Sequence, residues 1–550
     1  MTNKRITRPV SIILTLTLLA GIFCAVPAFA EEEPEAPLFE PTEGWGEDGV
    51  FEIANASDLL AFSEFDSDFA GKTVKLTANI DLNPGWTAAP GSQADGNLPV
   101  NYWAPVQNFK GTFDGQNFSI SGMFIYNDSV WDNGGLFAKV DGATIKNLVI
   151  KNSYMFTNHA SGGVAACVEN NTCTFENIYV DTIIEPKNPQ SPCCYVGGIV
   201  GRQTTAGANY INCVFAGSVT GREAVGGIVG ATASDYGVTD PAQATVTTFQ
   251  NCVNLGNVAA VQYEGSNRIS GTSGGIVGRV SGNVSLEGCI NLGTADTANG
   301  STNRWVSGGA ITVLDASNSD NNTASFSHTV TFKDCFWLKS SYPERAELTY
   351  TENGEEKSYF VGGSAIGVNK GDSNNGHKRN IYEEVRVEFT GAEPVSVISE
   401  ETTYDATGLN TLFFEDVMDL IPASETAEEI TGNAAFAEDF EIYNEQFMPK
   451  TIAAMLDFEK DQPTNVTPDP DQGEDPDEGE NTDSGEVTDT PDVPTAEPTG
   501  EETEAPQTPE TSGAADDAQE DGCASFIGGG TIVLVALAAA GVAVVRRKED

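Results

Sequence analysis

The sequence predicts an all-β protein built as a β-solenoid, with small capping elements, an acidic tether and a C-terminal apolar helix. Three observations carry this prediction. A diglycine followed by small or branched apolar residues recurs seven times, a short strand pattern follows most copies, and the chain ends in an apolar run behind an acidic, Pro-containing stretch. Self-similarity over intervals of some tens of residues is the sequence signature of repeat architectures.

The first element, residues 1–30, is typical of a secretory signal peptide. A basic start ends at Arg8, Ile12–Val26 is apolar, and a small-x-small cleavage site precedes Glu31. A lipoprotein signal at Cys24 is the alternative, but the residue before it is Phe, where a small residue is expected. Residues 31–49 are expected to be a linker that leads into the fold.

The diglycine repeat defines the expected solenoid, residues 50–380. Glycine supplies the backbone freedom that sharp corners need, and such short strands cannot bury a face alone. Stacking the copies solves this, because each coil pairs its backbone with the next at about 4.8 Å. The spacings between copies vary, so insertions are expected to loop out of the stack. The copies begin at Gly134, Gly162, Gly197, Gly226, Gly274, Gly308 and Gly362.

The strand pattern after each copy contains one column of small apolar residues. Leu or Ile fills the column early and Cys later, so the position is expected to point inward. Stacked Cα atoms about 5 Å apart would allow disulfides, but the aliphatic copies favour unbonded cysteines that pack as small hydrophobes. Better disulfide candidates are Cys167, Cys173 and the adjacent Cys193 and Cys194, since an exported chain permits such bonds. The column is Leu148, Ile178, Cys213, Cys252, Cys289 and Cys335.

Both ends of the solenoid are expected to carry caps, because open ends would offer unpaired strand edges. Residues 51–120 are expected to form the N-terminal cap and first coils, and residues 381–460 a C-terminal cap or small α/β unit. The expected elements are a capped short helix at 55–62, a strand at 74–82, two strands around an Asp-Gly turn at 111–122, and helices at 409–421 and 426–444.

The C-terminal elements set the expected location. Residues 461–522 hold 21 acidic residues and no Lys or Arg, so this stretch cannot bury enough apolar surface to fold and is expected to be a disordered tether. Residues 525–545 carry no charge and would span roughly 32 Å as a transmembrane helix. The basic cluster that begins residues 546–550 keeps this tail cytoplasmic. We therefore expect an exported protein, anchored to the cytoplasmic membrane with its bulk extracellular.

This end resembles the C-terminal sorting signals of bacterial surface proteins, in which a short motif precedes an apolar helix and a basic tail. The Leu-Pro-x-Thr-Gly motif of sortase substrates is missing, and Gly522-Cys523 resembles the Gly-Cys of some other signals. Retention and cleavage of the helix both stay open. A thick, Gram-positive cell wall is what the tether is expected to cross.

The repeats resemble the GLUG-type repeats of bacterial cell-surface proteins, which also occur in the β-helical N-terminal region of IgA-specific zinc metallopeptidases. The matching elements are Phe51–Leu60, Ile80–Leu82, Phe109–Gly122 and the Gly-Gly-Ile-Val-Gly copies with their Asn-Cys strands. The resemblance implies a right-handed parallel β-helix on an adhesin-like surface protein. It does not imply a particular ligand, and no protease domain is present in the matching part.

Composition and motifs argue against several activities. A net charge of −52 excludes a nucleic-acid binder, which needs a basic face. No His-Glu-x-x-His occurs, and His159, His328 and His377 each stand alone, so the zinc site of the metallopeptidases cannot be built. The solenoid region has no Asp-Asp pair and few Lys or Arg for a polysaccharide hydrolase or lyase. We expect no enzyme, no catalytic residues, no metal and no cofactor.

The expected function is adhesin-like display of the solenoid for an extracellular glycan, host or cell ligand. A carbohydrate-active β-helix enzyme and a passive wall-spacer are the alternatives. Carboxylates that converge with one another, or with Arg or Lys, would favour the enzyme. Exposed tryptophans could stack on sugars, although a place in the core is favoured for them; they are Trp103, Trp131, Trp305 and Trp337.

Overall fold

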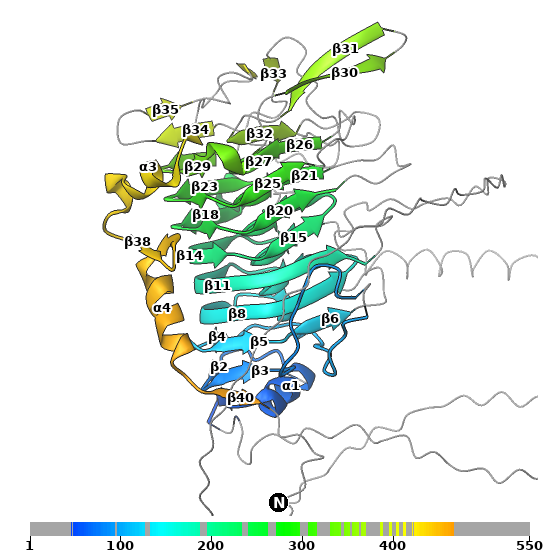
Figure 1. The fold of residues 1–550 in the computed structure, drawn as a ribbon, viewed down its shortest axis with the longest axis vertical. Coiled ribbons are helices and arrows are strands. Elements are labelled where there is room, and N and C mark those ends of the chain that lie inside the picture. The colour runs from blue at the N-terminus through cyan, green and yellow to red at the C-terminus, as the bar shows by residue number, and fades with distance from the viewer. Residues whose placement is uncertain are drawn as a thin grey trace, which may run out of the picture. The chain divides into compact units, whose positions relative to one another are not determined.

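The computed structural model describes residues 46–466, apart from short internal gaps, and all of them lie in the compact unit Met1–Gly473. The described chain is mostly β, with parallel strands in long sheets and few helices (Figure 1). The predicted signal peptide, most of the tether and the apolar C-terminal run lie outside it. Within the described residues, no helix is long and apolar enough to cross a membrane. The gaps are 47, 66, 94–95, 127–132, 188–194, 234–239, 262–270, 298–305, 316–329, 343–345, 353–354, 362–364, 370–385, 389–394, 399–402, 406–410, 414–420 and 422.

Successive turns of the chain add strands to three sheets, so the arrangement is solenoid-like. The five-stranded sheet contains β9 (Ser161–Gly162), β12 (Tyr195–Gly197), β16 (Ala224–Gly226), β21 (Gly271–Gly274) and β26 (Val306–Gly309). The seven-stranded sheet contains β7 (Phe137–Val140), β10 (Ala165–Val168), β13 (Val200–Gln203), β17 (Val229–Ala231), β22 (Val277–Val280), β27 (Thr312–Asp315) and β32 (Ile366–Asn369).

The 22-stranded sheet follows the longest part of each coil. Its first strands are β1 (Val50–Ile53), β2 (Thr73–Leu76), β3 (Asn79–Asp81), β4 (Thr112–Asp114), β5 (Ser119–Ser121), β6 (Phe124–Tyr126), β8 (Thr144–Thr157) and β11 (Cys173–Pro186). Its later coil strands are β14 (Ala208–Phe215), β15 (Ser218–Gly221), β18 (Val246–Gln250), β19 (Val253–Asn254), β20 (Asn257–Ala260), β23 (Asn283–Glu287), β24 (Ile290–Asn291), β25 (Thr294–Thr297), β28 (Val330–Lys333) and β29 (Phe336–Leu338).

The predicted apolar column is confirmed as an inward-facing stack. Leu148 pairs with Ile178 and Ile178 with Cys213, and the later copies continue this register. The cysteines of the column are buried and free. Cys167 and Cys173, two of the disulfide candidates, are also free, whereas Cys193 and Cys194 lie outside the described residues. Apolar packing, rather than cross-linking, therefore accounts for cysteine in the column.

The diglycine corners are tight because successive backbones nearly touch there. A Cβ on Gly198 would lie 2.1 Å from the carbonyl oxygen of Gly227, so only glycine fits. The sixth copy was expected to begin at Gly308, but Gly309 and not Gly308 pairs with the first glycine of the fifth copy, Gly274. This copy is therefore shifted by one residue, and Ala310 takes the second corner position.

The N-terminal cap contains α1 (Ala56–Glu64), which begins as expected after Asn55, whose side chain accepts a hydrogen bond from the Asp58 amide. Rings from this cap and the first coils pack together, with Phe62 against Phe69 and Phe109. The cap thereby closes the first coil with apolar side chains.

The C-terminal elements depart from the expected helices. The helix predicted at 409–421 is wrong for Thr411–Phe413, which form β36. The helix predicted at 426–444 is wrong for Phe440–Tyr443, which form β38. The remaining elements are η1 (Pro241–Gln243), η2 (Lys339–Ser341), β30 (Ala346–Glu352), β31 (Glu355–Val361), β33 (Arg386–Glu388), β34 (Val395–Ile398), β35 (Thr403–Asp405), β37 (Ala423–Ser424), α3 (Ala427–Thr431), η3 (Ala434–Phe436), β38 (Phe440–Tyr443), β39 (Gln446–Pro449), α4 (Lys450–Lys460) and β40 (Thr464–Val466).

Candidate functional site

Two of the four tryptophans considered for sugar stacking are core residues, as the sequence analysis favoured. Trp103 and Trp337 are buried, and their indole nitrogens donate to backbone oxygens of Leu136 and Ile421, respectively. Their rings are therefore closed to a ligand. Trp131 and Trp305 lie outside the described residues.

The one described histidine does not belong to a metal site. His159 is half-buried, with Nδ1 2.8 Å from the Asn133 side-chain oxygen. Burial and the nearby Arg202 guanidinium lower the pKa of His159 to about 4, so the ring is neutral at physiological pH. No group of three His, Cys, Asp or Glu in the described residues could hold a metal ion. His328 and His377 fall in the gaps.

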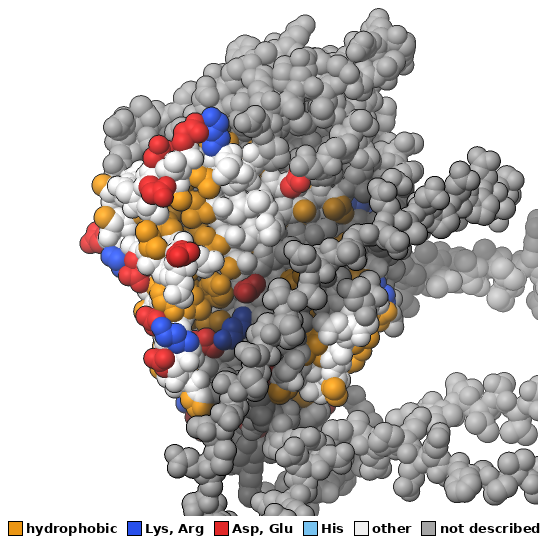
Figure 2. Space-filling view, in the orientation of Figure 1, with side chains coloured by type: hydrophobic (Ala, Val, Ile, Leu, Met, Phe, Trp, Pro, Cys, Tyr) orange, Lys and Arg blue, Asp and Glu red, His pale blue; other side chains and the backbone are white. Residues whose placement is uncertain are grey.

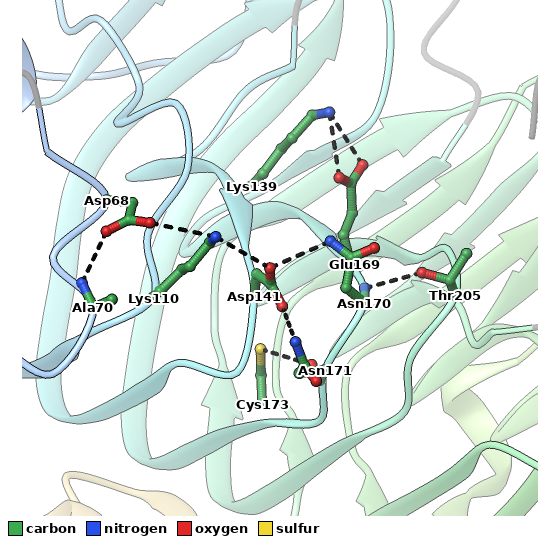
Figure 3. Close-up of polar contacts among 10 residues, drawn as sticks. All are labelled: Asp68, Ala70, Lys110, Lys139, Asp141, Glu169, Asn170, Asn171, Cys173 and Thr205. Carbon is green, nitrogen blue, oxygen red and sulfur yellow. Dashed lines mark hydrogen bonds and ion pairs between the residues drawn. The ribbon is translucent and has the colours of Figure 1, made fainter. Parts of the chain in front are cut away.

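Acidic side chains do gather at one corner, between the seven-stranded and the 22-stranded sheets (Figure 3). Asp141 is buried and accepts hydrogen bonds from the side chains of Asn170 (3.3 Å) and Asn171 (2.7 Å). The Lys110 ammonium lies 3.7 Å from Asp141 and 3.3 Å from Asp68, so one cation joins both acids. Both carboxylates therefore have polar partners on neighbouring coils, and the corner joins these coils.

A second charged cluster surrounds Tyr195 at the start of β12. The guanidinium groups of Arg202 and Arg279 both lie over the Tyr195 ring, each 5.3 Å from its centroid. Register explains the meeting, because Arg202 pairs with Ala231 and Ala231 pairs with Arg279, so the small side chain leaves room for the longer ones. Both arginines follow a Gly-Gly-Ile-Val-Gly copy, which is a signal that the sequence carries and that our sequence interpretation missed.

The most exposed large apolar side chain of the described residues, Val100, belongs to a long loop between β3 and β4. We call residues 83–102 the presenting loop. A loop of this length without regular structure is uncommon in a compact fold unless it has a function. Here it is held firmly: Asn83 donates to the carbonyl oxygens of Asn101 and Gly122, and Asn152 of β8 donates to that of Trp86.

A carboxylate from β11 completes the attachment of the presenting loop. One oxygen of Glu185 accepts hydrogen bonds from the Gly91 amide (3.1 Å) and the Tyr154 hydroxyl (2.5 Å). Burial and this acidic neighbour raise the pKa of Tyr154 well above its usual range, so the hydroxyl keeps its proton and remains the donor. The loop is thus fixed to the sheet at both its ends and its middle.

The outer side of the presenting loop is apolar. Leu98, Val100 and Tyr102 are 45%, 90% and 50% exposed, whereas Pro99 between them is buried. Three apolar side chains within five residues are thus exposed on this loop. Trp86 and Tyr102 both stand edge-on against the buried Phe124 ring, at centroid distances of 5.7 and 5.2 Å, which fixes their orientation.

The sequence interpretation assigned this loop to the N-terminal cap and did not single it out. Leu98, Val100 and Tyr102 alternate with other residues, as apolar residues do in a half-buried strand. The sequence pattern therefore gives no sign that these three side chains are exposed. The available signal was the distance between the strand ending at Leu82 and the repeat element at Phe109, which is too long for an ordinary connection.

Comparisons with known proteins add little to this geometry. No family model matches the chain, and no curated protein matches it. It is similar to a solved structure described as a "putative immunoglobulin A1 protease" from Bacteroides ovatus, with 15% identity over 73% of this chain and 92% of that chain and a TM-score of 0.32. A similarity of this size carries no argument about fold or activity, and the resemblance to GLUG repeats stays a prediction.

Proposed function

We infer that the protein is an adhesin-like surface protein that displays a right-handed parallel β-helix and binds an extracellular ligand through the presenting loop. The single observation that carries this proposal is a loop that hydrogen bonds hold to the sheet and that exposes three apolar side chains within five residues, Leu98, Val100 and Tyr102. Exposing Val100 at 90% is unfavourable in water and is expected where a partner covers the surface. Rigid attachment lowers the entropy that binding would otherwise cost.

The ligand class that fits best is an uncharged glycan. Trp86 and Tyr102 supply oriented rings, and the exposed Asn97 and Thr87 supply polar groups beside them. The described residues of the loop include no Lys or Arg, and the protein carries a net charge of −52, which disfavours an anionic ligand. An exported, membrane-anchored location, proposed from the two ends of the sequence, would place this loop outside the cell.

The enzyme is the weaker candidate. Two clusters of charged groups are a corner of paired carboxylates and two arginines on Tyr195. A glycoside hydrolase needs two carboxylates across a bond, one of them able to donate a proton. The corner acids are instead each paired with lysine or amide partners, which supports a structural role.

The test is a glycan array probed with residues 31–473, which retain β40 of the compact unit. We expect binding to neutral glycans that Tyr102→Ala and Val100→Ala each weaken at least tenfold. Val246→Ala is the matched control, because Val246 is also exposed (55%) but lies on β18, away from the loop. Binding that survives both loop variants, or that Val246→Ala weakens equally, contradicts the assignment of the loop, and no binding to any glycan contradicts the proposed ligand.

A further inference from the structure

The C-terminal part of the described chain runs back along the coils. We call residues 423–466 the strap. At its start, β37 pairs with β29 of a late coil, and at its end, β40 pairs with β3 of the first coil. Figure 1 shows α3, β38 and α4 lying along one side of the stacked strands between these two points.

The strap covers an apolar column on the outside of the 22-stranded sheet. The column consists of Val149, Val214, Val253 and Ile290, one from each of four coils, and all four are buried. The strap side chains packed with it include Phe436, Phe447, Met448, Ile452 and Met455. On the face shown in Figure 2, apolar side chains gather along the strap with charged ones around them.

A polar lock fastens the far end of the strap. The buried Glu459 of α4 accepts a hydrogen bond from the Ser119 hydroxyl (2.8 Å), and the Lys151 ammonium lies 2.5 Å from the same oxygen. The Asn79 side chain donates to the carbonyl oxygens of Glu459 and Gln462, which end the helix. These contacts tie the last turn of α4 to three successive strands, β3, β5 and β8.

The backbone attachment of the strap is short by comparison with that of the coils. β40 pairs with β3 over three residues and β37 with β29 over two, whereas β11 pairs with β8 from Thr174 to Pro186. The side chains of the strap also pack in a separate apolar cluster on the outside of the sheet, whereas the coils pack their side chains in one continuous core. Segments with few ladder bonds and a separate apolar cluster open at lower free energy than the core.

We propose that the strap is a detachable clasp, which opens as one unit while the coils stay folded. Load applied on the C-terminal side reaches β40 before it reaches any coil, because β40 is the last described element of the chain. Opening frees the 44 residues from Ala423 to Val466 and lengthens the chain by roughly 150 Å of contour. If the protein binds a ligand at one end and is pulled at its C-terminal end, the strap would therefore extend before the coils unfold.

Hydrogen exchange on the mature chain tests whether the clasp is one unit. Glu459→Gln is expected to raise amide exchange roughly tenfold throughout α3, β38, β39 and α4, and to leave β14 and β18 unchanged. Asp457→Asn is the matched control, because Asp457 lies on the same helix and pairs with Lys460 of that helix at the surface. A response confined to α4, a response of the coils, or an equal effect of Asp457→Asn overturns the proposal.

Single-molecule extension between the two ends of residues 31–473 tests the order of opening. The first event is expected to release roughly 150 Å of contour, and Glu459→Gln is expected to lower the force of that event alone. A first event of a different length, or one insensitive to Glu459→Gln, overturns the clasp whatever the outcome of the ligand-binding test.

Discussion

At the scale of single residues, the decisive feature is one left-handed residue in each coil, placed just before the apolar column. Asn147, Asn177, Asn212 and Asn251 have φ between 50° and 54°, and Gly288 and Asp334 take the equivalent place in later coils. Asn is the residue that tolerates this conformation best after Gly. The side chains of the first three are also linked, since Asn212 donates to Asn177 and Asn177 to Asn147.

Replacing one of these asparagines tests the left-handed requirement. Asn212→Ala is expected to lower the free energy of unfolding by about 2 kcal/mol, from backbone strain and the lost side-chain bond. Asn212→Gly relieves the backbone strain and is expected to lower the free energy of unfolding by less than about 1 kcal/mol. Urea unfolding of the two variants measures the difference, and equal losses would show that the conformation is not what the site selects.

The stacked thiols make stability depend on pH. Burial raises the pKa of Cys252, Cys289 and Cys335 well above the ordinary value, so the folded chain keeps these protons after the unfolded chain has lost them. These thiols therefore do not lower the free energy of unfolding below about pH 8.5. Above that pH, each thiol lowers it by about 1.4 kcal/mol per pH unit.

Cys252→Val tests this dependence, because aliphatic residues fill the same column in the early coils. The variant is expected to remove about 1.4 kcal/mol per pH unit from the slope of unfolding free energy between pH 9 and 10. Comparing slopes cancels any change at neutral pH. An unchanged slope would mean that Cys252 ionises as readily in the folded chain as in the unfolded one.

At the scale of elements, the repeat explains why most of the coil strands could be predicted and the C-terminal ones could not. The same strand pattern recurs beside each diglycine, so each copy supports the prediction of a strand in the others. The region around Thr411–Phe413 shows no such repetition, and its apolar spacing fits a helix as well as the strand that forms. The presenting loop was missed for a related reason, since Leu98, Val100 and Tyr102 alternate as strand residues do.

The corner glycines give the sharpest test at this scale. Gly198→Ala would place a Cβ 2.3 Å from the Phe215 ring as well as against the next backbone, and a loss of about 3 kcal/mol or more is expected. Gly71→Asn is the control, because Gly71 has φ 70° and no atom near its missing Cβ, and it should lose less than about 1 kcal/mol. Thermal or urea unfolding measures both, and similar losses would contradict close packing at the corner.

At the scale of the whole described unit, the coils depend on the strap for cover. Its removal would expose Val149, Val214, Val253 and Ile290, which now pack under α4 and its neighbours. A chain ending at residue 422 is expected to unfold at a lower urea concentration than residues 31–473 and to bind more of an apolar dye. Equal midpoints and equal dye binding would show that the strap contributes nothing to the fold.

The central claim is that the repeats stack in register, one coil above the next, and a distance between two labels tests it most directly. Lys146 and Lys333 occupy one outward column, joined through Glu176, Ile211, Gln250 and Glu287, so five strand spacings separate their Cα atoms. Spin labels introduced there as unnatural amino acids should report a narrow distribution centred near 24 Å, before correction for the label arms. A broad distribution, or one centred beyond about twice that distance, would contradict the stack.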